Sequence, residues 1–91
     1  MAFCVYILQC TDGSFYTGYT KNLAERIKQH ENGKGAKYTK SHKPQKIAYV
    51  EDLSSRSQAM KRERAIKKLS RQQKIFLIDS QNKKTPLDEE R

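Results

Sequence analysis

The sequence predicts one small α+β domain that combines three strands with about three helices. Two stretches rich in apolar and aromatic residues flank a turn signal near the N-terminus. Capped segments of helical periodicity lie on both sides of a third apolar stretch. The 91 residues leave room for a single core, since domains usually take roughly 100 to 200 residues. We expect the domain to span residues 1–80, and the polar residues 81–91 to form a disordered tail.

The first two strands are expected to pair as a hairpin. Residues 3–9 are apolar on both alternating faces, which is typical of a central strand. Residues 14–20 form a second short strand rich in Thr and Tyr, and residues 11–13, Thr-Asp-Gly, are the turn signal between the two.

The length of this loop decides which side chains of the hairpin share a face, because a one-residue slip turns every side chain over. A two-residue turn would place Tyr6 opposite Tyr19. A three-residue loop, with Gly13 in the left-handed conformation, would place Tyr6 opposite Gly18. We favour the second register, which puts Tyr6 and Tyr16 on one face and leaves open space at Gly18 in front of Tyr6.

The next segment is predicted to be a helix followed by a long basic loop. Asn22 and Glu25 have the spacing of a capping box, and the helix should end before Gly33 after about ten residues. On this helix Arg26 flanks the apolar stripe. Residues 33–45 are expected to form a loop, and long basic loops are often functional or mobile.

A third strand and two further helices complete the predicted domain. Residues 46–53 are apolar on both faces, and a helix with an N-cap at Ser55 should run to about residue 69. Glu63 places a carboxylate inside the apolar stripe of that helix. Ser70 caps the last helix, which continues through the apolar residues 75–78.

The charge distribution indicates an anionic partner. The chain carries 19 Lys and Arg against 10 Asp and Glu, a net charge of +9. Residues 21–74 hold 16 of the basic and 5 of the acidic side chains, a net of +11. A field of this kind attracts polyanions, and nucleic acid is the commonest polyanion in cytoplasm.

Several other classes are excluded by the composition. No apolar stretch approaches the roughly 20 residues that a transmembrane helix needs, and the N-terminus lacks the features of a signal peptide. We therefore expect a cytoplasmic protein without a membrane partner. Cys4 and Cys10 lie about 20 Å apart along one strand, too far for a disulfide, and are expected to be small core residues.

Three features depart from ordinary patterning, and each has an ordinary explanation. Tyr6 and Tyr16 could be cross-strand core residues with their hydroxyls at the edge. Arg26 could extend its charge to solvent or pair with an acid. Glu63 could pair with Lys67 one helical turn later. The residue pattern alone leaves these explanations open.

These features and several neighbouring residues follow one another in a characteristic order along the chain. They are the triplets Val5-Tyr6-Ile7 and Tyr16-Thr17-Gly18, followed by Asn22, Leu23, Arg26, His30 and Glu63. This order resembles the GIY-YIG endonuclease superfamily, with Val5 where the family usually has Gly and Thr17 where it has Ile. The likeness covers about residues 3–78. The small size resembles the stand-alone bacterial subfamily, which is similar to the N-terminal nuclease module of the excision-repair subunit UvrC.

The resemblance implies an α/β sandwich in which helices pack around a small three-stranded antiparallel sheet. It also implies metal-dependent hydrolysis of phosphodiester bonds in DNA, with branched or damaged DNA as candidate substrates. Glu63 would hold Mg²⁺ or Mn²⁺. Mg²⁺ commonly takes only one or two protein carboxylates and fills its octahedron with waters and substrate phosphate.

The resemblance also implies roles for four other side chains. Arg26 would place a permanently charged fork on the scissile phosphate. Tyr6 would act as general base and Tyr16 would position water or phosphate, although the two roles could be exchanged. A tyrosine is only about 0.1% ionised at pH 7, so the base needs a nearby cation or a partner that takes its proton. His30 is expected to contact phosphate or to assist this proton transfer.

Residues outside the catalytic set are expected to bind the nucleic acid. Tyr19 stands where several relatives carry a small or basic residue, and it could stack on a base instead. His42 is a weaker candidate in the basic loop. The expected nucleic-acid-binding residues are Tyr19, Lys21, Lys34, Lys37, Tyr38, Lys40 and Lys43.

Two other interpretations fit the same sequence. The scaffold could bind nucleic acid without catalysis, which the degenerate triplets and the basic charge would equally allow. The basic surface could instead dock an acidic protein partner. DNA is favoured over RNA as the partner.

Overall fold

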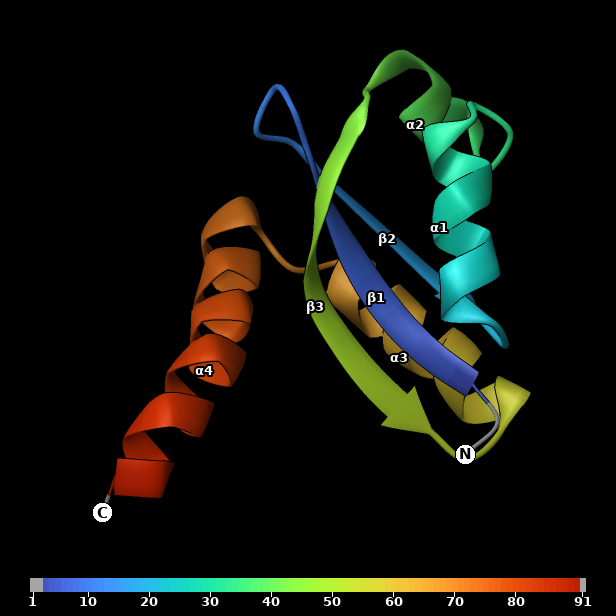
Figure 1. Ribbon diagram of the computed structural model, residues 1–91. Coiled ribbons are helices and arrows are strands. Elements are labelled where there is room, and N and C mark those ends of the chain that lie inside the picture. The colour runs from blue at the N-terminus through green and yellow to red at the C-terminus, as the bar shows by residue number, and fades with distance from the viewer. Residues whose placement is uncertain (1–2, 91) are drawn as a thin grey trace.

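A three-stranded antiparallel sheet lies at the centre of the molecule, with helices on both faces (Figure 1). The computed structural model describes the backbone of residues 3–90 and the side chains of residues 3–82. The elements in chain order are β1 (Phe3–Cys10), β2 (Phe15–Thr20), α1 (Leu23–Glu31), α2 (Lys37–Ser41), β3 (Pro44–Leu53), α3 (Arg56–Lys67) and α4 (Arg71–Glu90). The strand order β2-β1-β3 makes β1 the central strand, as its apolar faces predicted.

The hairpin of β1 and β2 has the predicted three-residue loop. Tyr6 pairs with Gly18, and Leu8 pairs with Tyr16. Gly13 adopts a φ of +88°, and its N–H donates to the carbonyl of Cys10 at 2.9 Å. This is the left-handed position of a type I turn with a bulge, so the register with both tyrosines on one face is confirmed.

The three predicted helix starts are confirmed by their caps. The Asn22 side chain accepts from the backbone N–H of Glu25 at 3.1 Å, which opens α1. The side chains of Ser55 and Ser70 open α3 and α4 by accepting from the N–H three residues later.

The predicted loop of residues 33–45 contains a short helix that the sequence did not indicate, and the predicted third strand begins two residues earlier than expected. Its middle forms the short helix α2, and its last two residues already belong to β3, which begins at Pro44. A helix of five residues is too short to show an apolar period, and its N-cap residue Ala36 makes no side-chain hydrogen bond. The prediction of an irregular loop was therefore wrong for these residues.

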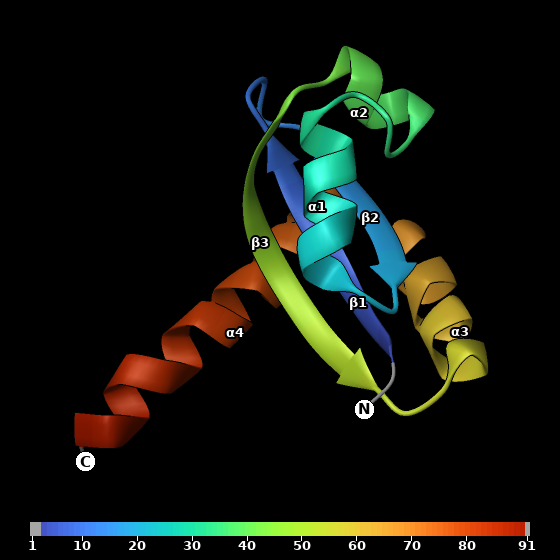
Figure 2. The same ribbon diagram turned by 45° about the vertical axis from the view of Figure 1, so that its right-hand side comes forward.

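The larger apolar core lies between the sheet and the helices α3 and α4. It is formed by Val5, Ile7, Tyr49, Ala59, Ile66 and Ile78. In Figure 2 α1 lies in front of the sheet and α3 on its far side, so the sheet separates two layers of helix. This is the predicted sandwich, with one face of the sheet filled by ordinary core residues. Cys4 and Cys10 are buried and free, as expected.

The last helix continues beyond the expected domain boundary. The backbone of α4 is helical to Glu90, whereas residues 81–91 were expected to form a disordered tail; the side chains of residues 83–91 lie outside the described part. Phe76 is 77% exposed on this helix. None of the helices in the described part of the chain is long and apolar enough to span a membrane.

Candidate functional site

A pocket of about 410 Å³ lies at the β2 edge of the sheet, where α1 approaches from one side and α3 from the other. It is lined by Tyr6, Tyr16, Gly18, Tyr19, Thr20, Arg26, Gln29 and Glu63. Segments that are far apart in the sequence therefore place three phenols, a guanidinium and a carboxylate around one cavity.

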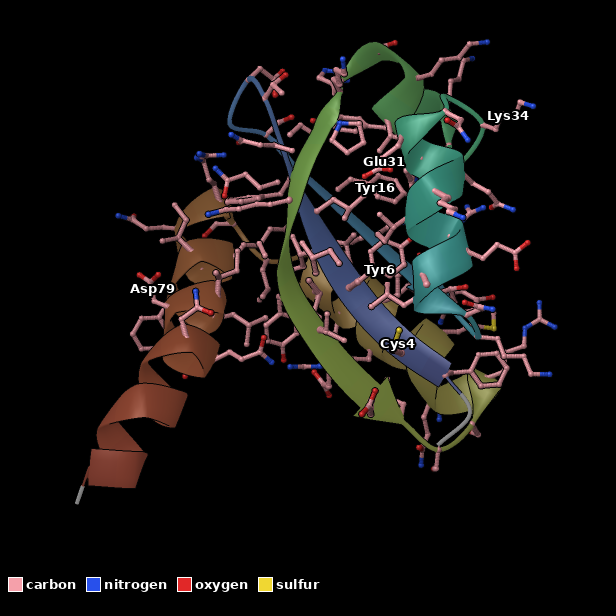
Figure 3. All side chains as sticks on the ribbon, in the orientation of Figure 1. Cys4, Tyr6, Tyr16, Glu31, Lys34 and Asp79 are labelled. Atoms are coloured by element: carbon pink, nitrogen blue, oxygen red, sulfur yellow. The ribbon has the colours of Figure 1, made fainter. Side chains whose placement is uncertain are left out.

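Tyr6 and Tyr16 lie on the α1 side of the sheet, as Figure 3 shows. Their ring centroids are 6.4 Å apart. Tyr6 is fully buried, and its ring covers Gly18: a Cβ at that position would lie 2.6 Å from the Tyr6 hydroxyl oxygen. The open space expected at Gly18 is therefore occupied by Tyr6 itself, which explains why the position needs glycine.

His30 lies behind the pocket and joins Tyr6 to α2 through a chain of hydrogen bonds. The Tyr6 hydroxyl is 2.8 Å from His30 Nε2. The other ring nitrogen, Nδ1, is 2.7 Å from the hydroxyl of Thr39, which also reaches the carbonyl oxygen of Ala36 at 3.2 Å. Tyr6, His30 and Thr39 are all buried. The structure thus places His30 at the Tyr6 hydroxyl and away from the pocket surface.

The surroundings of Tyr6 and His30 shift the two pKa values in directions that favour the uncharged form of each side chain. Burial raises the pKa of Tyr6 to about 12, and the nearby Arg26 guanidinium opposes this increase only in part. Burial and the positive charge of Arg26 lower the pKa of His30 from its usual 6.5. At neutral pH the resting pair is therefore a phenol beside an uncharged imidazole.

Arg26 is held in place by two acceptors. Its Nη1 donates to Oε1 of Gln29 at 2.8 Å, and its Nη2 donates to the carbonyl oxygen of Gly35 at 2.8 Å. A guanidinium has five N–H groups, so donors remain for an anion in the pocket. The half-buried side chain lines the cavity beside Tyr6 and Glu63. An arginine fixed in this way presents a stationary positive charge.

Glu63 enters the pocket from α3 with its side chain 19% exposed. One of its carboxylate oxygens lies 3.3 Å from Nζ of Lys67, so the ordinary i, i+4 pairing considered from the sequence is present as well. Within residues 3–82, no three His, Cys, Asp or Glu side chains lie close enough to hold a metal ion together. A single carboxylate in a pocket of this size suits Mg²⁺, which keeps several waters and takes few protein ligands.

The candidate nucleic-acid contacts comprise one aromatic residue of the pocket, one aromatic residue of α2 and a set of exposed lysines. Tyr19 lines the pocket, and its hydroxyl accepts from Arg56 Nε at 3.4 Å. The ring of Tyr38 is stacked on that of His42, with 3.9 Å between the ring centroids, and it lies near Tyr16, with 6.0 Å between the centroids. Tyr38 is therefore part of an aromatic cluster within the protein. The lysines are exposed, and Figure 3 shows Lys34 pointing away from the sheet beyond α1. The exposed lysines are Lys21, Lys34, Lys37, Lys40 and Lys43.

Three residues of the site were missed by the sequence analysis. Gln29 and Gly35 orient Arg26, and Thr39 contacts His30. Gly35 also touches the ring of His30 so closely that a Cβ would collide with it. The capping and spacing rules gave no signal for these roles, because each depends on a contact between α1 and the segment that follows it.

The fold and the pocket define the class of the protein. Residues 2–76 match the family described as the GIY-YIG catalytic domain, and this stretch is most of the chain. The chain therefore belongs to the GIY-YIG superfamily, a nuclease-type family whose members generally use divalent metal ions and act on nucleic acid.

The similarity to particular proteins places the chain in the small stand-alone UPF0213 branch of that superfamily. It is 55% identical over 75 residues to a UPF0213 protein of Staphylococcus haemolyticus, which covers 82% of this chain and 92% of that protein. The identity to a UPF0213 protein of Clostridium perfringens is 53% over 78 residues, or 86% and 84% of the two chains.

Two solution NMR structures have the same fold. The UPF0213 protein BH0048 from Bacillus halodurans is 44% identical, with a TM-score of 0.58 over 96% of this chain and 90% of that chain. The protein EF2693 from E. faecalis is 40% identical, with a TM-score of 0.57 over 85% and 83%. The α+β class and the antiparallel sheet expected from the sequence are thereby confirmed.

Proposed function

We propose that this protein is a metal-dependent endonuclease that hydrolyses phosphodiester bonds in DNA. The observation that carries the proposal is the convergence of Tyr6, Tyr16, Arg26 and Glu63 on one pocket. The positive charge of the surrounding surface, part of the net +9 of the chain, would attract the polyanion. Branched and damaged DNA are the substrates to examine first.

In this proposal Tyr6 is the general base and His30 takes its proton. The phenol would accept a proton from the attacking water while its own proton passes to His30 Nε2, 2.8 Å away. A phenolate need not accumulate, which matters because the pKa of Tyr6 is raised to about 12. Tyr16, which lines the same pocket with its ring centroid 6.4 Å from that of Tyr6, would orient the water or the phosphate.

Arg26 and Glu63 would stabilise the charge that develops on the phosphate. The guanidinium is already fixed by Gln29 and Gly35, so little reorganisation is needed when an anion enters. Glu63, which lines the same pocket, would hold Mg²⁺ or Mn²⁺ there. The bound cation would supply Lewis-acid stabilisation of the transferring phosphoryl group.

A cleavage assay with matched variants tests the proposal. Purified protein is incubated with supercoiled, nicked, branched and single-stranded DNA, with Mg²⁺, with Mn²⁺ or with EDTA. We expect metal-dependent cleavage that Glu63→Ala and Arg26→Ala each reduce by at least about 100-fold, the loss typical of one transition-state donor. Lys67→Ala removes the ion-pair partner of Glu63 without removing a pocket residue, and should retain activity. Cleavage that survives Glu63→Ala and Arg26→Ala would contradict the proposal.

A binding module without catalysis is the second candidate function, and the Glu63–Lys67 ion pair favours it. In that case Glu63 only neutralises a neighbouring charge, and Glu63→Ala should leave DNA affinity unchanged or tighter. The affinity should fall linearly in a log-log salt plot and should not depend on added metal. Weaker binding of metal and DNA by Glu63→Ala would argue against this alternative.

A further inference from the structure

The short helix α2 contributes one buried hydroxyl to the hydrogen-bond chain that ends at Tyr6. Thr39 is 2% exposed, and its Oγ1 lies 2.7 Å from His30 Nδ1 and 3.2 Å from the carbonyl oxygen of Ala36. No residue of α2 lines the pocket. The hydroxyl of Thr39 therefore reaches the site through His30.

The acceptor at the end of the chain fixes the order of the protons. A carbonyl oxygen can only accept, so the contact with Ala36 uses the single hydroxyl proton of Thr39. Thr39 must then accept from His30, which places the imidazole proton on Nδ1. The free lone pair of Nε2 is left facing the Tyr6 hydroxyl, which donates to it.

The opposite order leaves a buried donor without a partner. If Thr39 donated to Nδ1, the imidazole proton would sit on Nε2 and would point at the Tyr6 oxygen. The hydroxyl proton of Tyr6 would then have no acceptor among residues 3–82, although this side chain is fully buried. A buried O–H group without an acceptor is costly, so the first order is favoured.

We infer that Thr39 is a positioning residue, which holds His30 in the Nδ1–H tautomer so that Nε2 can take the proton of Tyr6. Gly35 supports this arrangement from the other side, because its lack of a Cβ lets the imidazole lie against the backbone. The catalytic meaning of the inference rests on the proposed nuclease function. The proton order itself does not, and it can be measured on the protein without substrate.

Nitrogen NMR of the imidazole tests the proton order directly. In protein labelled with ¹⁵N at histidine, the ring-nitrogen shifts and their couplings to the ring protons distinguish the two tautomers at a pH where His30 is neutral. We expect the Nδ1–H tautomer in the wild type. Thr39→Val keeps the size of the side chain but removes the acceptor, and should move His30 toward the Nε2–H tautomer. Thr39→Ser keeps the hydroxyl and should restore the wild-type pattern.

The spectra of the two variants also report whether each is folded, so a change of tautomer can be separated from unfolding. A wild type with the Nε2–H tautomer would overturn the inference. So would a Thr39→Val protein that is folded and has an unchanged tautomer.

DNA cleavage with Mg²⁺ gives a second measurement. We expect Thr39→Val to lower the turnover rate by about 10- to 100-fold with little change in the KM for DNA, and Thr39→Ser to recover most of the rate. Wild-type turnover by Thr39→Val would overturn the positioning role. A wild type that shows the Nδ1–H tautomer and cleaves no DNA would contradict the proposed nuclease and leave the proton order intact.

Discussion

Tyr6 is the residue at which packing and chemistry meet. It is fully buried, its ring lies on Gly18, and its hydroxyl is bonded to His30. Full burial removes the rotational freedom that an exposed tyrosine would have. The hydroxyl is therefore held at one place beside Arg26 and the pocket.

The contact between Gly18 and Tyr6 predicts a substitution effect with its own rescue. Gly18→Ala places a Cβ 2.6 Å from the Tyr6 oxygen and 3.1 Å from the ring of Tyr16. We expect a loss of about 1 to 3 kcal/mol of unfolding free energy, as for other overpacked sites, and loss of the Tyr6–His30 bond. Urea denaturation measures the first effect and NMR of His30 the second.

Two further variants of the chain test whether the effect comes from the contact with Tyr6. Gly18→Ala should cost less in a Tyr6→Phe background, because the colliding oxygen is gone. Gly33→Ala is the matched control: Gly33 has a φ of +77° with nothing within 4 Å, so it should cost about 1 kcal/mol from backbone strain alone and leave His30 unchanged. Equal behaviour of His30 in the two alanine proteins would contradict the explanation.

For individual residues, the sequence predicted the site where the type of residue and its order along the chain were sufficient. The loop length correctly placed Tyr6 and Tyr16 on one face, and the resemblance brought Arg26 and Glu63 into the same hypothesis. The sequence could not predict the role of Thr39, because that role depends on how the five-residue helix α2 packs against α1.

The helices differ in how strongly the local sequence specifies them. The helices α1, α3 and α4 begin at side-chain caps that are visible in the sequence, and all three starts were predicted. The short helix α2 has no side-chain cap and is held instead by tertiary contacts, including Thr39 with His30 and the stacking of Tyr38 on Tyr16. Its existence follows from the packing, so local sequence rules could not find it.

The exposed lysines of α2 should contribute to nucleic-acid affinity through charge. Each phosphate that a cation neutralises adds about −0.9 to the slope of log affinity against log salt concentration on duplex DNA. We expect Lys37→Gln to reduce the steepness of that slope by about one unit. Fluorescence anisotropy with labelled duplex at several salt concentrations measures it.

Lys46→Gln provides the matched control for charge. Lys46 is also exposed, but it lies on β3 and lines a second cavity, which it shares with residues of α4 such as Ile75 and Ile78 and with none of the pocket residues. Its replacement should weaken binding through the overall field and leave the slope nearly unchanged. Equal slopes for the Lys37→Gln and Lys46→Gln proteins would show that Lys37 makes no direct phosphate contact.

In the molecule as a whole, the two faces of the sheet are covered by different kinds of side chain. The face toward α3 and α4 holds the apolar core, and the face toward α1 and α2 holds the buried Tyr6, His30 and Thr39. Polar groups buried on one face make the stability of the entire domain depend on their protonation.

The pKa shifts predict a loss of stability at both ends of the pH range. Burial lowers the pKa of His30, so the unfolded chain binds the proton more readily than the folded chain does. The contribution of His30 to stability is fully present above about pH 6.5 and is lost as the pH falls from there through the lowered pKa of the folded protein. Burial raises the pKa of Tyr6 to about 12 and also raises the pKa values of Tyr49, Cys4 and Cys10. Alkali therefore favours the unfolded chain from about pH 9 upward, where the two thiols begin to ionise in the unfolded state.

Thermal or urea unfolding across pH 4 to 12 measures this profile. His30→Gln, whose side chain does not titrate, should be less stable at pH 7 and should lose the decrease just below pH 6.5. The pKa of Asp12 is lowered from its usual 3.8, so its contribution to stability is lost only below about pH 3.8, outside the range in which His30 acts. An unchanged acid-side decrease in His30→Gln would assign it to another group.

The location of the pocket at the β2 border bears on where along a chain a cut could be made. A site at the bottom of a tunnel admits only a strand that is threaded from its terminus. Here the cavity is framed by an outer strand and two helices, so a phosphate from the interior of a closed circle can approach sideways, without a free end. This layout suits incision within a strand better than stepwise trimming from its tip.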